Sequence, residues 1–143
     1  MELLRGAALV ADAGNDVRSE ATDVPSGADK TVATILGEIV WLMSQSAEFK
    51  QYLISDLEWL VMPPILLRQF RLFYHEGRPA GAVLFARVSS EVAGRLDFGA
   101  PTMRVNDWKS GELLKIVKII APFGGGDKFL DQTQDFLSRL DVD

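Results

Sequence analysis

The sequence predicts one α/β (α+β) domain in which helices flank a sheet. Three observations point to this class. Apolar residues recur at helical spacing near residues 31–43, two apolar runs flank a short turn near residue 77, and a later strand leads through glycines into a helix. A chain of 143 residues with 48% hydrophobic and 24% charged residues has enough apolar side chains for one ordinary core.

The composition argues against several classes of function. The chain has no cysteine, which excludes disulfides, thiolate metal sites and a cysteine nucleophile, and its single histidine argues against a zinc site. A net charge of -5 and a pI near 4.9 argue against broad nucleic-acid binding. No apolar run reaches the roughly 20 residues of a membrane helix, and the first residues lack the basic region of a signal peptide. We therefore expect a cytoplasmic protein that binds no metal, nucleic acid or membrane.

The composition changes near residue 30. Residues 11–30 (ADAGNDVRSEATDVPSGADK) are small, polar and acidic and contain no aromatic residue. Such a segment buries too little apolar surface to offset the entropy that it loses on ordering. The sequence therefore predicts a flexible acidic tail over residues 1–30 and a folded domain over residues 31–143.

The first half of the domain is expected to be helical. Asp29 or Thr31 can serve as the N-cap of a helix with one apolar face, made of Val32, Ile35, Leu36, Ile39, Val40 and Met43. Ser46 is placed to cap a further short turn. Residues 55–58 (SDLE) have the form of a capping box at the start of another short helix, and residues 63–64 (PP) are expected to end that helix.

The second half is expected to supply the sheet. Two apolar, aromatic-rich runs flank residues 76–79 (EGRP), which predicts a β-hairpin whose strands are covered on both faces. Ser89 or Ser90 is expected to cap a short helix that Gly99 ends. Residues 113–121 (LLKIVKIIA) predict a strand, and residues 127–140 (DKFLDQTQDFLSRL) predict a last amphipathic helix. Strict alternation along the strand would place one lysine in an apolar row, made of Leu114, Ile116, Lys118 and Ile120.

A glycine-rich turn lies between that strand and that helix, made of Ala121, Pro122, Phe123, Gly124, Gly125 and Gly126. Glycines allow a ligand to approach the backbone closely, and free N–H groups at a helix start attract anions, so one interpretation is recognition of a phosphate or a pantetheine arm. The turn is neither a Walker motif nor a GxGxxG fingerprint. Asp127 suits an N-cap and would repel an anion, so a simple strand-to-helix turn is the other interpretation.

Five stretches, in this order along roughly residues 34–130, resemble the RTX toxin-activating (haemolysin-activating) lysine acyltransferases: LGEIVWLMSQS, ISDLEWLVMPPILLRQFRLF, GRPAGAVLFARVSSEV, DWKSGE and IAPFGGGDK. The resemblance implies a single domain akin to the Gcn5-related N-acetyltransferases, with a mixed central sheet flanked by helices. It implies a fatty acyl donor on acyl carrier protein, whose pantetheine arm the turn 121–126 would accept, and no covalently bound cofactor. It also implies acceptor lysines in a secreted protoxin and a cytoplasmic homodimer.

The chemistry of this family needs a base, because a lysine ammonium must lose a proton before its nitrogen attacks a thioester. The family's histidine lies in a Ser-Pro-Leu-His-Lys/Arg segment, which here reads SAEFK (46–50), so its position falls on Phe49. The family's aspartate, on the strand before the turn, corresponds to Lys118. A phenyl ring accepts no proton, and a lysine has the wrong charge to orient an imidazolium. Glu48 is one helical step away on another face, and His75 lies in the hairpin turn, where a solvated side chain is expected.

Both substituted positions have two interpretations. Phe49 either packs in the core or makes the old cleft drier, and Lys118 either snorkels or pairs with an acid, or contacts a phosphopantetheine phosphate or an acidic partner. Residues 107–111 (DWKSG) are expected to form an ordered turn. Two hypotheses follow: a catalytically inactive family member that acts as a regulator or scaffold by binding protein, and an active acyl-carrier-protein-dependent lysine acyltransferase with a different base. The chemistry favours the first.

Overall fold

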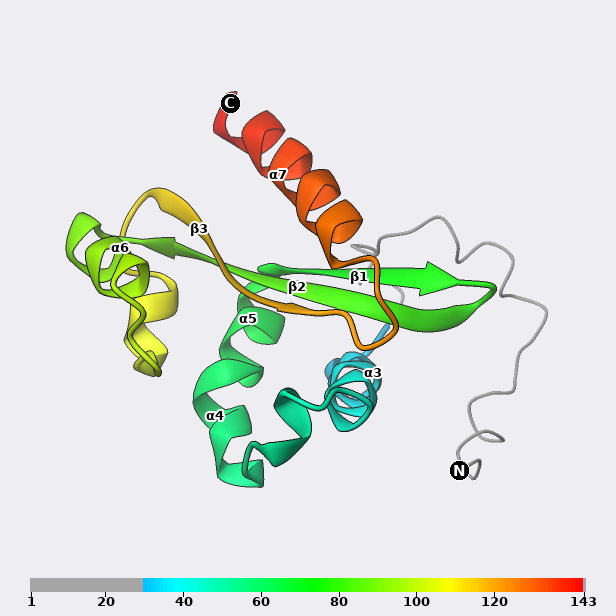
Figure 1. The fold of residues 1–143 in the computed structure, drawn as a ribbon. Coiled ribbons are helices and arrows are strands. Elements are labelled where there is room, and N and C mark those ends of the chain that lie inside the picture. Colours follow the sequence, from blue (N-terminus) through cyan, green and yellow to red (C-terminus); the bar gives the residue numbers. More distant parts are fainter. Residues whose placement is uncertain (1–29, 143) are drawn as a thin grey trace.

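A three-stranded sheet with helices on both faces forms the folded part of the chain, shown as a computed structural model in Figure 1. The structure describes residues 30–142. The predicted tail, residues 1–30, lies outside the described residues except for Lys30, so the boundary between tail and domain stays a prediction. The combination of helices and strands that the sequence predicted is confirmed.

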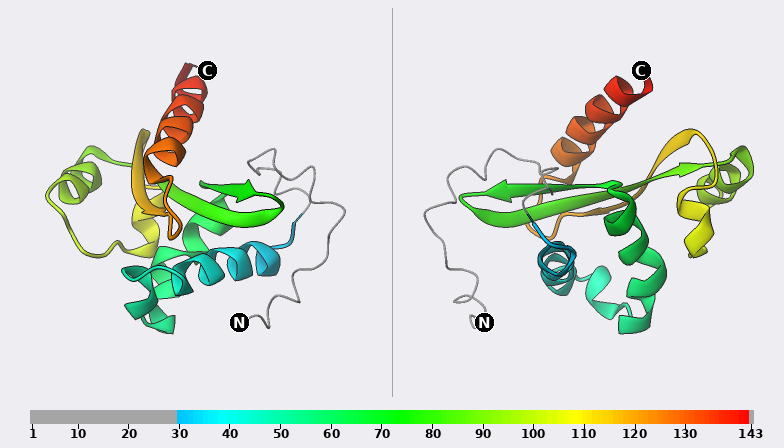
Figure 2. Two further views of the ribbon diagram at one scale, coloured as in Figure 1. Left: turned by 45° about the vertical axis from the view of Figure 1, so that its right-hand side comes forward. Right: turned by 180° about the vertical axis from the view of Figure 1, so that it is seen from behind.

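The helices lie in two layers and at one end of the sheet (Figure 2). One face is covered by α3 (Val32–Ser44), α4 (Leu57–Leu60) and α5 (Met62–Leu67). The other face carries α7 (Gly126–Val142), while α6 (Ser90–Asp97) lies at the end of the sheet. Within the described part of the chain, no helix combines the length and the apolar character needed to cross a bilayer.

Helix α3 forms as its sequence predicts. The N-cap is Thr31, whose hydroxyl oxygen accepts a hydrogen bond from the backbone N–H of Thr34 at 3.1 Å. The buried stripe of the helix consists of Ile35, Ile39, Leu42 and Met43. Beyond the helix, the N–H of Phe49 donates to Ser46 Oγ at 3.2 Å and opens the short 3-10 helix η3 (Phe49–Gln51). The predicted capping role of Ser46 is therefore confirmed.

The following segment differs from its prediction in two ways. The capping box expected at residues 55–58 is wrong, because Asp56 is itself the capping side chain. Its carboxylate accepts hydrogen bonds from the N–H of Leu53 at 2.8 Å and from the indole N–H of Trp59 at 3.0 Å, which closes the 3-10 helix η4 (Ile54–Asp56) ahead of α4. Helix α4 ends at Leu60, ahead of the prolines at 63–64, as predicted, but these prolines also begin a further helix that the sequence did not predict. They occupy the first turn of α5, where a missing backbone donor costs nothing.

The predicted hairpin consists of β1 (Phe70–His75) and β2 (Arg78–Val88). Its turn is shorter than expected. Glu76 and Gly77 have φ angles of 53° and 78°, and a two-residue turn of this kind matches the twist of the strands that it joins. Pro79 already belongs to β2, where it pairs with Tyr74.

The third strand, β3 (Leu113–Ile120), pairs antiparallel with β2, so the sheet β1-β2-β3 is antiparallel throughout. The expectation of a mixed sheet is therefore wrong for the strands that the structure describes. The chain leaves β2 after Val88, forms α6 and the 3-10 helix η5 (Val105–Trp108) at that end, and returns at Leu113 opposite Val88. A strand that re-enters from the same end must run in the opposite direction.

A β-bulge changes the faces of β3. Lys118 pairs with Leu84 of β2, whereas Ile116 pairs with the next residue, Phe85, so Val117 is the extra residue between them. Directly opposed residues share a face of the sheet. The predicted single row of alternating residues is therefore wrong, because the bulge puts Lys118 and Ile116 on opposite faces.

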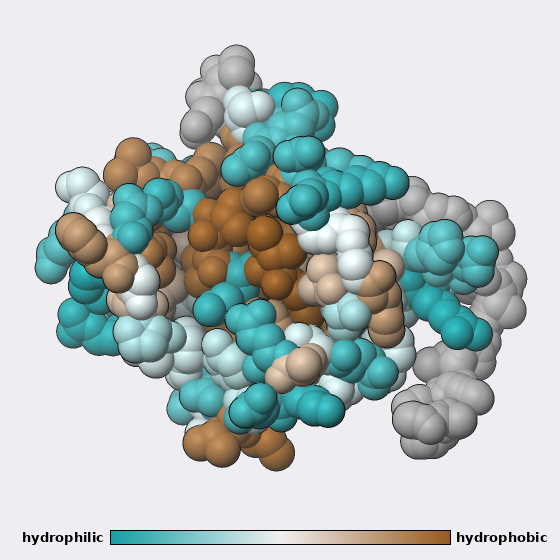
Figure 3. Space-filling view, in the orientation of Figure 1, coloured by the Kyte–Doolittle hydropathy of each residue, from teal (hydrophilic) through white to brown (hydrophobic). Residues whose placement is uncertain are grey.

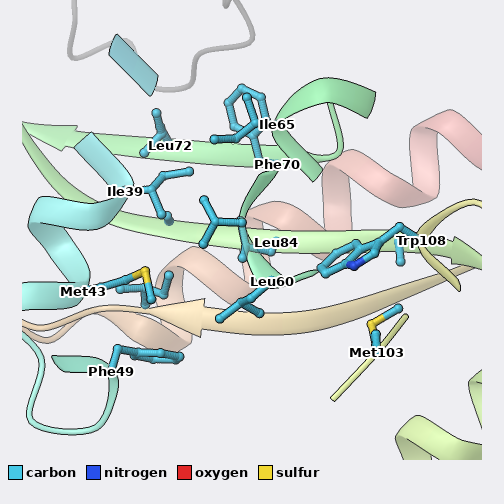
Figure 4. Close-up of a cluster of buried hydrophobic side chains, with 14 of the residues drawn as sticks. Ile39, Met43, Phe49, Leu60, Ile65, Phe70, Leu72, Leu84, Met103 and Trp108 are labelled. Carbon is cyan, nitrogen blue, oxygen red and sulfur yellow. The ribbon is translucent and has the colours of Figure 1, made fainter. Parts of the chain in front are cut away.

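The main core lies between the sheet and the layer of α3, α4 and α5 (Figure 4). Leu84 and Trp108 are fully buried in it. On the opposite face, α7 packs through aromatic pairs: the ring of Phe129 lies 4.6 Å from that of Phe73, and the ring of Phe136 lies 6.4 Å from that of Phe85. The strands β1 and β2 are therefore covered on both faces, as the sequence predicted.

Candidate functional site

Phe49, at the position that the resemblance gives to a base, is a core residue. Its side chain is 3% exposed and belongs to the main buried cluster. Figure 4 shows it at the margin of that cluster, near Met43. The ring lies 5.4 Å from the ring of Tyr52. The neighbouring Glu48 is exposed, so it points away from the position, as the helical step predicts. The packing interpretation of Phe49 is confirmed.

Lys118, at the position of the family's aspartate, faces the same side of the sheet as Phe49. Its cross-strand partner Leu84 belongs to the buried cluster that contains Phe49, and opposed residues share a face. The lysine is half-buried, and among the residues that the structure describes no salt bridge involves it. The two substituted positions therefore lie on one side of the sheet, as they would for a pair with a shared task.

The glycine-rich turn, residues 121–126, joins β3 to α7. Gly124 and Gly125 have φ angles of 96° and 86°, in the left-handed region that glycine adopts without strain. Phe123 is 59% exposed, and its ring lies 5.7 Å from the ring of Trp41 in α3. The shape of the turn itself accounts for both of these glycines. Contact with a pantetheine arm or an acyl donor by residues 121–126 stays a prediction.

Residues 107–111 form the expected ordered turn, anchored by Asp107. Its side chain is 9% exposed and accepts a hydrogen bond from the N–H of Arg104 at 2.9 Å, and it pairs with the guanidinium of Arg95 at 3.3 Å. Burial alone would raise the pKa of Asp107. The hydrogen bond from Arg104 and the charge of Arg95 outweigh burial, so the pKa lies below its ordinary value. This carboxylate is engaged in structure and is not poised as a base.

The next residue, Trp108, ties this turn to the helical layer. It is fully buried, and its indole N–H donates to the carbonyl oxygen of Trp59 at 2.7 Å. The buried Gln69 donates from Nε2 to the carbonyl oxygens of Trp108 at 3.0 Å and of Phe85 at 3.3 Å. No pattern in the sequence predicted that Gln69 is buried, because glutamine side chains are usually exposed.

His75, the sole histidine, lies at the hairpin turn with 79% of its side chain exposed. Its Nε2 atom is 3.6 Å from a carboxylate oxygen of Glu76. The expectation that this side chain is solvated is confirmed. A base in an acyl-transfer site must reach the attacking nitrogen in a desolvated cleft, and an exposed turn provides none.

Sequence reasoning missed a polar cluster between α3 and β1. The carboxylate of Glu38 accepts a hydrogen bond from Lys30 Nζ at 2.9 Å and another from the Tyr74 hydroxyl at 2.5 Å. The same ammonium lies 4.4 Å from the centre of the Tyr74 ring. No spacing rule links these three residues, which are brought together by the packing of α3 on the hairpin. The cluster ties Lys30, just ahead of α3, to the hairpin.

Comparison with known proteins places the chain in a family. Residues 28–139 match the RTX toxin acyltransferase family (HlyC), which covers most of the chain, so the protein belongs to that family. It is 33% identical over 98 residues to the lysine-acyltransferase RtxC of Vibrio cholerae, which is 66% of this chain and 63% of that protein. It is 30% identical over 90 residues to the RTX-II toxin-activating lysine-acyltransferase ApxIIC of Actinobacillus pleuropneumoniae, which is 63% of this chain and 56% of that protein.

A third relative is the uncharacterized protein sll0720 of Synechocystis sp., 34% identical over 92 residues, which is 63% of either chain. The chain therefore spans less than two thirds of the length of each of these relatives. The family predicted from the five sequence stretches is confirmed. The activity and the acceptors of the relatives are properties of those proteins.

Proposed function

We propose that this chain is a member of the RTX toxin acyltransferase family that transfers no acyl group and acts by binding another protein, as a cytoplasmic regulator or scaffold. The observation that carries the proposal is the burial of Phe49, which is 3% exposed at the position of the family's histidine. A base must touch the proton that it removes. A phenyl ring that packs in the core has no lone pair to accept a proton.

The substitution at Lys118 supports the same conclusion. A carboxylate at this position would hold a neighbouring imidazole in its protonated state, whereas an ammonium repels that charge. Lys118 lies on the same side of the sheet as Phe49, so the chain has changed both members of the expected pair in one place. A single change leaves room for compensation, while two changes remove both the base and its support.

The second candidate function is acyl transfer from acyl carrier protein to a protein lysine with a different base. The glycine-rich turn favours it, because Gly124 and Gly125 keep the open left-handed backbone and Phe123 stays exposed beside them. An acyl carrier protein would then serve as donor. In the binding proposal it would be a ligand or a protein partner. Under both proposals, the domain is akin to the Gcn5-related N-acetyltransferases.

Co-expression separates the two functions. The protein is produced together with acyl carrier protein and an RTX-II protoxin, and the intact mass of the protoxin is measured. The proposal expects no added acyl mass with this chain, whereas the relative ApxIIC, an RTX-II toxin-activating lysine-acyltransferase by name, serves as the positive control. An acyl adduct that depends on this chain would overturn the proposal.

A paired variant, Phe49→His with Lys118→Asp, tests whether these two residues are the reason that the chain transfers no acyl group. If acyl transfer fails for want of the pair alone, this variant gains an adduct on the protoxin. The single variants Phe49→His and Lys118→Asp are the matched controls, and each is expected to give less adduct than the pair. Circular dichroism on each variant confirms that a negative result comes from a folded protein.

A further inference from the structure

The outer edge of β3 is uncovered and borders a groove. This strand is the last in the order β1-β2-β3, and within residues 30–142 it pairs with β2 alone. Figure 3 shows an apolar patch in the middle of the face on which β3 and α7 lie. A groove of about 440 Å³ opens between α6, β3 and α7, and four of its lining side chains are apolar: Leu96, Leu114, Ile116 and Leu137. An open edge beside an apolar groove is a template for a further strand.

The sequence ELLK, which leads into β3, has a near copy, ELLR, in the tail that precedes the described residues. ELLK begins at Glu112 and ELLR at Glu2, and each has an acid first, two leucines and a base fourth. When the two segments lie antiparallel, Glu2 comes beside Lys115 and Arg5 beside Glu112. Opposite charges then meet at both ends, whereas a parallel arrangement would bring like charges together. The charges therefore select the antiparallel direction.

The same register gives each leucine of the tail segment an apolar neighbour. Directly opposed residues share a face of a sheet, so Leu3 lies beside Leu114, which lines the groove. Leu4 lies beside Leu113, which is 48% exposed. Both tail leucines would therefore be removed from water, one in the groove and one on the other face of the strand.

Lys115 can join this arrangement without losing its present partner. Its Nζ atom lies 2.8 Å from a carboxylate oxygen of Asp97, and an ammonium has three N–H donors. The side chain of Lys115 is 33% exposed, so a second carboxylate, that of Glu2, can approach it from solvent.

The chain between the two segments is long enough to join them. The described residues begin at Lys30, whose ammonium lies over the ring of Tyr74 near the hairpin turn. Leu113 is opposite Val88 at the far end of β2, and the 11 residues of β2 measure roughly 35 Å. Residues 6–29 reach up to about 80 Å when extended and about 27 Å as an average flexible chain. A short strand is marginal alone, but such a tether holds it at roughly millimolar effective concentration.

We propose that residues 2–5 add to the edge of β3 in the same chain as a short antiparallel strand, with Glu2 beside Lys115 and Arg5 beside Glu112. The tail then closes the open edge, and any protein that pairs with this edge has to displace it. The proposal does not depend on the lack of acyl transfer. Its test measures proximity within one chain, so the two proposals fail independently.

Disulfide formation in the full chain tests the pairing, because the wild type has no cysteine. Leu4→Cys with Leu113→Cys puts thiols on directly opposed residues, at a spacing that a disulfide can bridge. Oxidised glutathione converts the two thiols to a disulfide and is itself reduced. Ala13→Cys with Leu113→Cys is the matched control, with the same strand position and a tail residue outside the register. The first pair is expected to close about tenfold faster or more, at a rate independent of protein concentration.

The charges supply a second test in the background of the first cysteine pair. Arg5→Glu brings two carboxylates together and is expected to slow closure by about three- to tenfold. Addition of Glu112→Arg restores an opposite pair and is expected to recover most of the rate. Arg18→Glu makes the same change of charge outside the ELLR segment and should leave the rate unchanged.

Three results would overturn the proposal. The first is an equal rate of closure for the two cysteine pairs. The second is a disulfide that joins two chains in place of one, seen as a doubled mass without reductant. The third is a rate that Arg5→Glu leaves unaltered, with circular dichroism showing that each variant is folded.

Discussion

Phe49 and the glycine-rich turn at residues 121–126, the two regions that the family resemblance connects with acyl transfer, differ in their exposure to solvent. Phe49 is 3% exposed and packs against Tyr52, whereas Phe123 in the turn is 59% exposed and Gly124 has a positive φ angle of 96°. The first is part of the hydrophobic core. The second is largely exposed, and contact between it and an acyl donor stays a prediction.

This difference shows that the position which the resemblance gives to a base can be occupied by a core side chain in this fold. A base requires a partly polar cavity, and a buried aromatic ring fills such a cavity and stabilises the core. A turn between a strand and a helix keeps its glycines because its backbone needs them, with or without a ligand. Stability measurements can therefore separate the two regions.

The largest effect is expected from Phe49→Ala. Truncation of a buried aromatic ring should lower the free energy of unfolding by about 3–5 kcal/mol, because apolar burial is lost and a cavity remains. Phe123→Ala is the matched control and should cost less than about 1 kcal/mol, since that ring is mostly exposed. Urea unfolding gives both values. Equal costs would show that the two regions do not differ in the way described.

A smaller effect is expected from Asp107→Asn, which tests how much the contacts of this carboxylate with Arg104 and Arg95 stabilise the fold. The loss of a charged hydrogen-bond acceptor should cost about 1–3 kcal/mol at pH 7. The fold lowers the pKa of Asp107, so its contribution is complete above the unfolded pKa of about 3.9 and is lost as the pH falls through the folded value. The difference in unfolding free energy between wild type and variant should therefore shrink below about pH 4. A difference that stays constant with pH would contradict this assignment.

The smallest effects concern two glycines. Gly125→Ala should destabilise the fold by about 1–2 kcal/mol, because φ is 86° and the added carbon would lie 3.3 Å from the Phe129 ring. Gly37→Ala, in the middle of α3 with nothing within 4 Å of the added carbon, should stabilise it by about 0.5–1 kcal/mol. Thermal unfolding of both variants distinguishes them by the sign of the change in Tm. A destabilised Gly37→Ala variant would show that α3 is more constrained than its surroundings indicate.

The helices and the hairpin could be predicted from the sequence because local patterns of residues determine those elements. The stripe of α3, the Thr31 cap and the hairpin flanking Gly77 all depend on neighbours along the chain. The mixed sheet was wrong because strand direction depends on the route of the chain between elements. The prediction that Ile116 shares a face with Lys118 was wrong, because the bulge at Val117 arises only when β3 pairs with β2.

The site was predictable only in part for the same reason. Position by position, the family resemblance identified Phe49 and Lys118, and the packing of Phe49 followed from its aromatic side chain. The cluster around Glu38 was invisible, because Lys30 and Tyr74 meet it only after α3 packs on the sheet. Long-range polar contacts of this kind carry no periodic signal.

The central claim is that this chain transfers no acyl group, and its most direct test is to measure cleavage of the thioester that joins the acyl chain to its carrier protein. Purified wild-type protein is mixed with fatty acyl carrier protein and an RTX-II protoxin, and the release of the carrier's free thiol is followed with time. The account predicts release no faster than in buffer, because the core position of Phe49 supplies no base. Thiol release that requires the wild-type protein and is matched by acyl mass on the protoxin would contradict it.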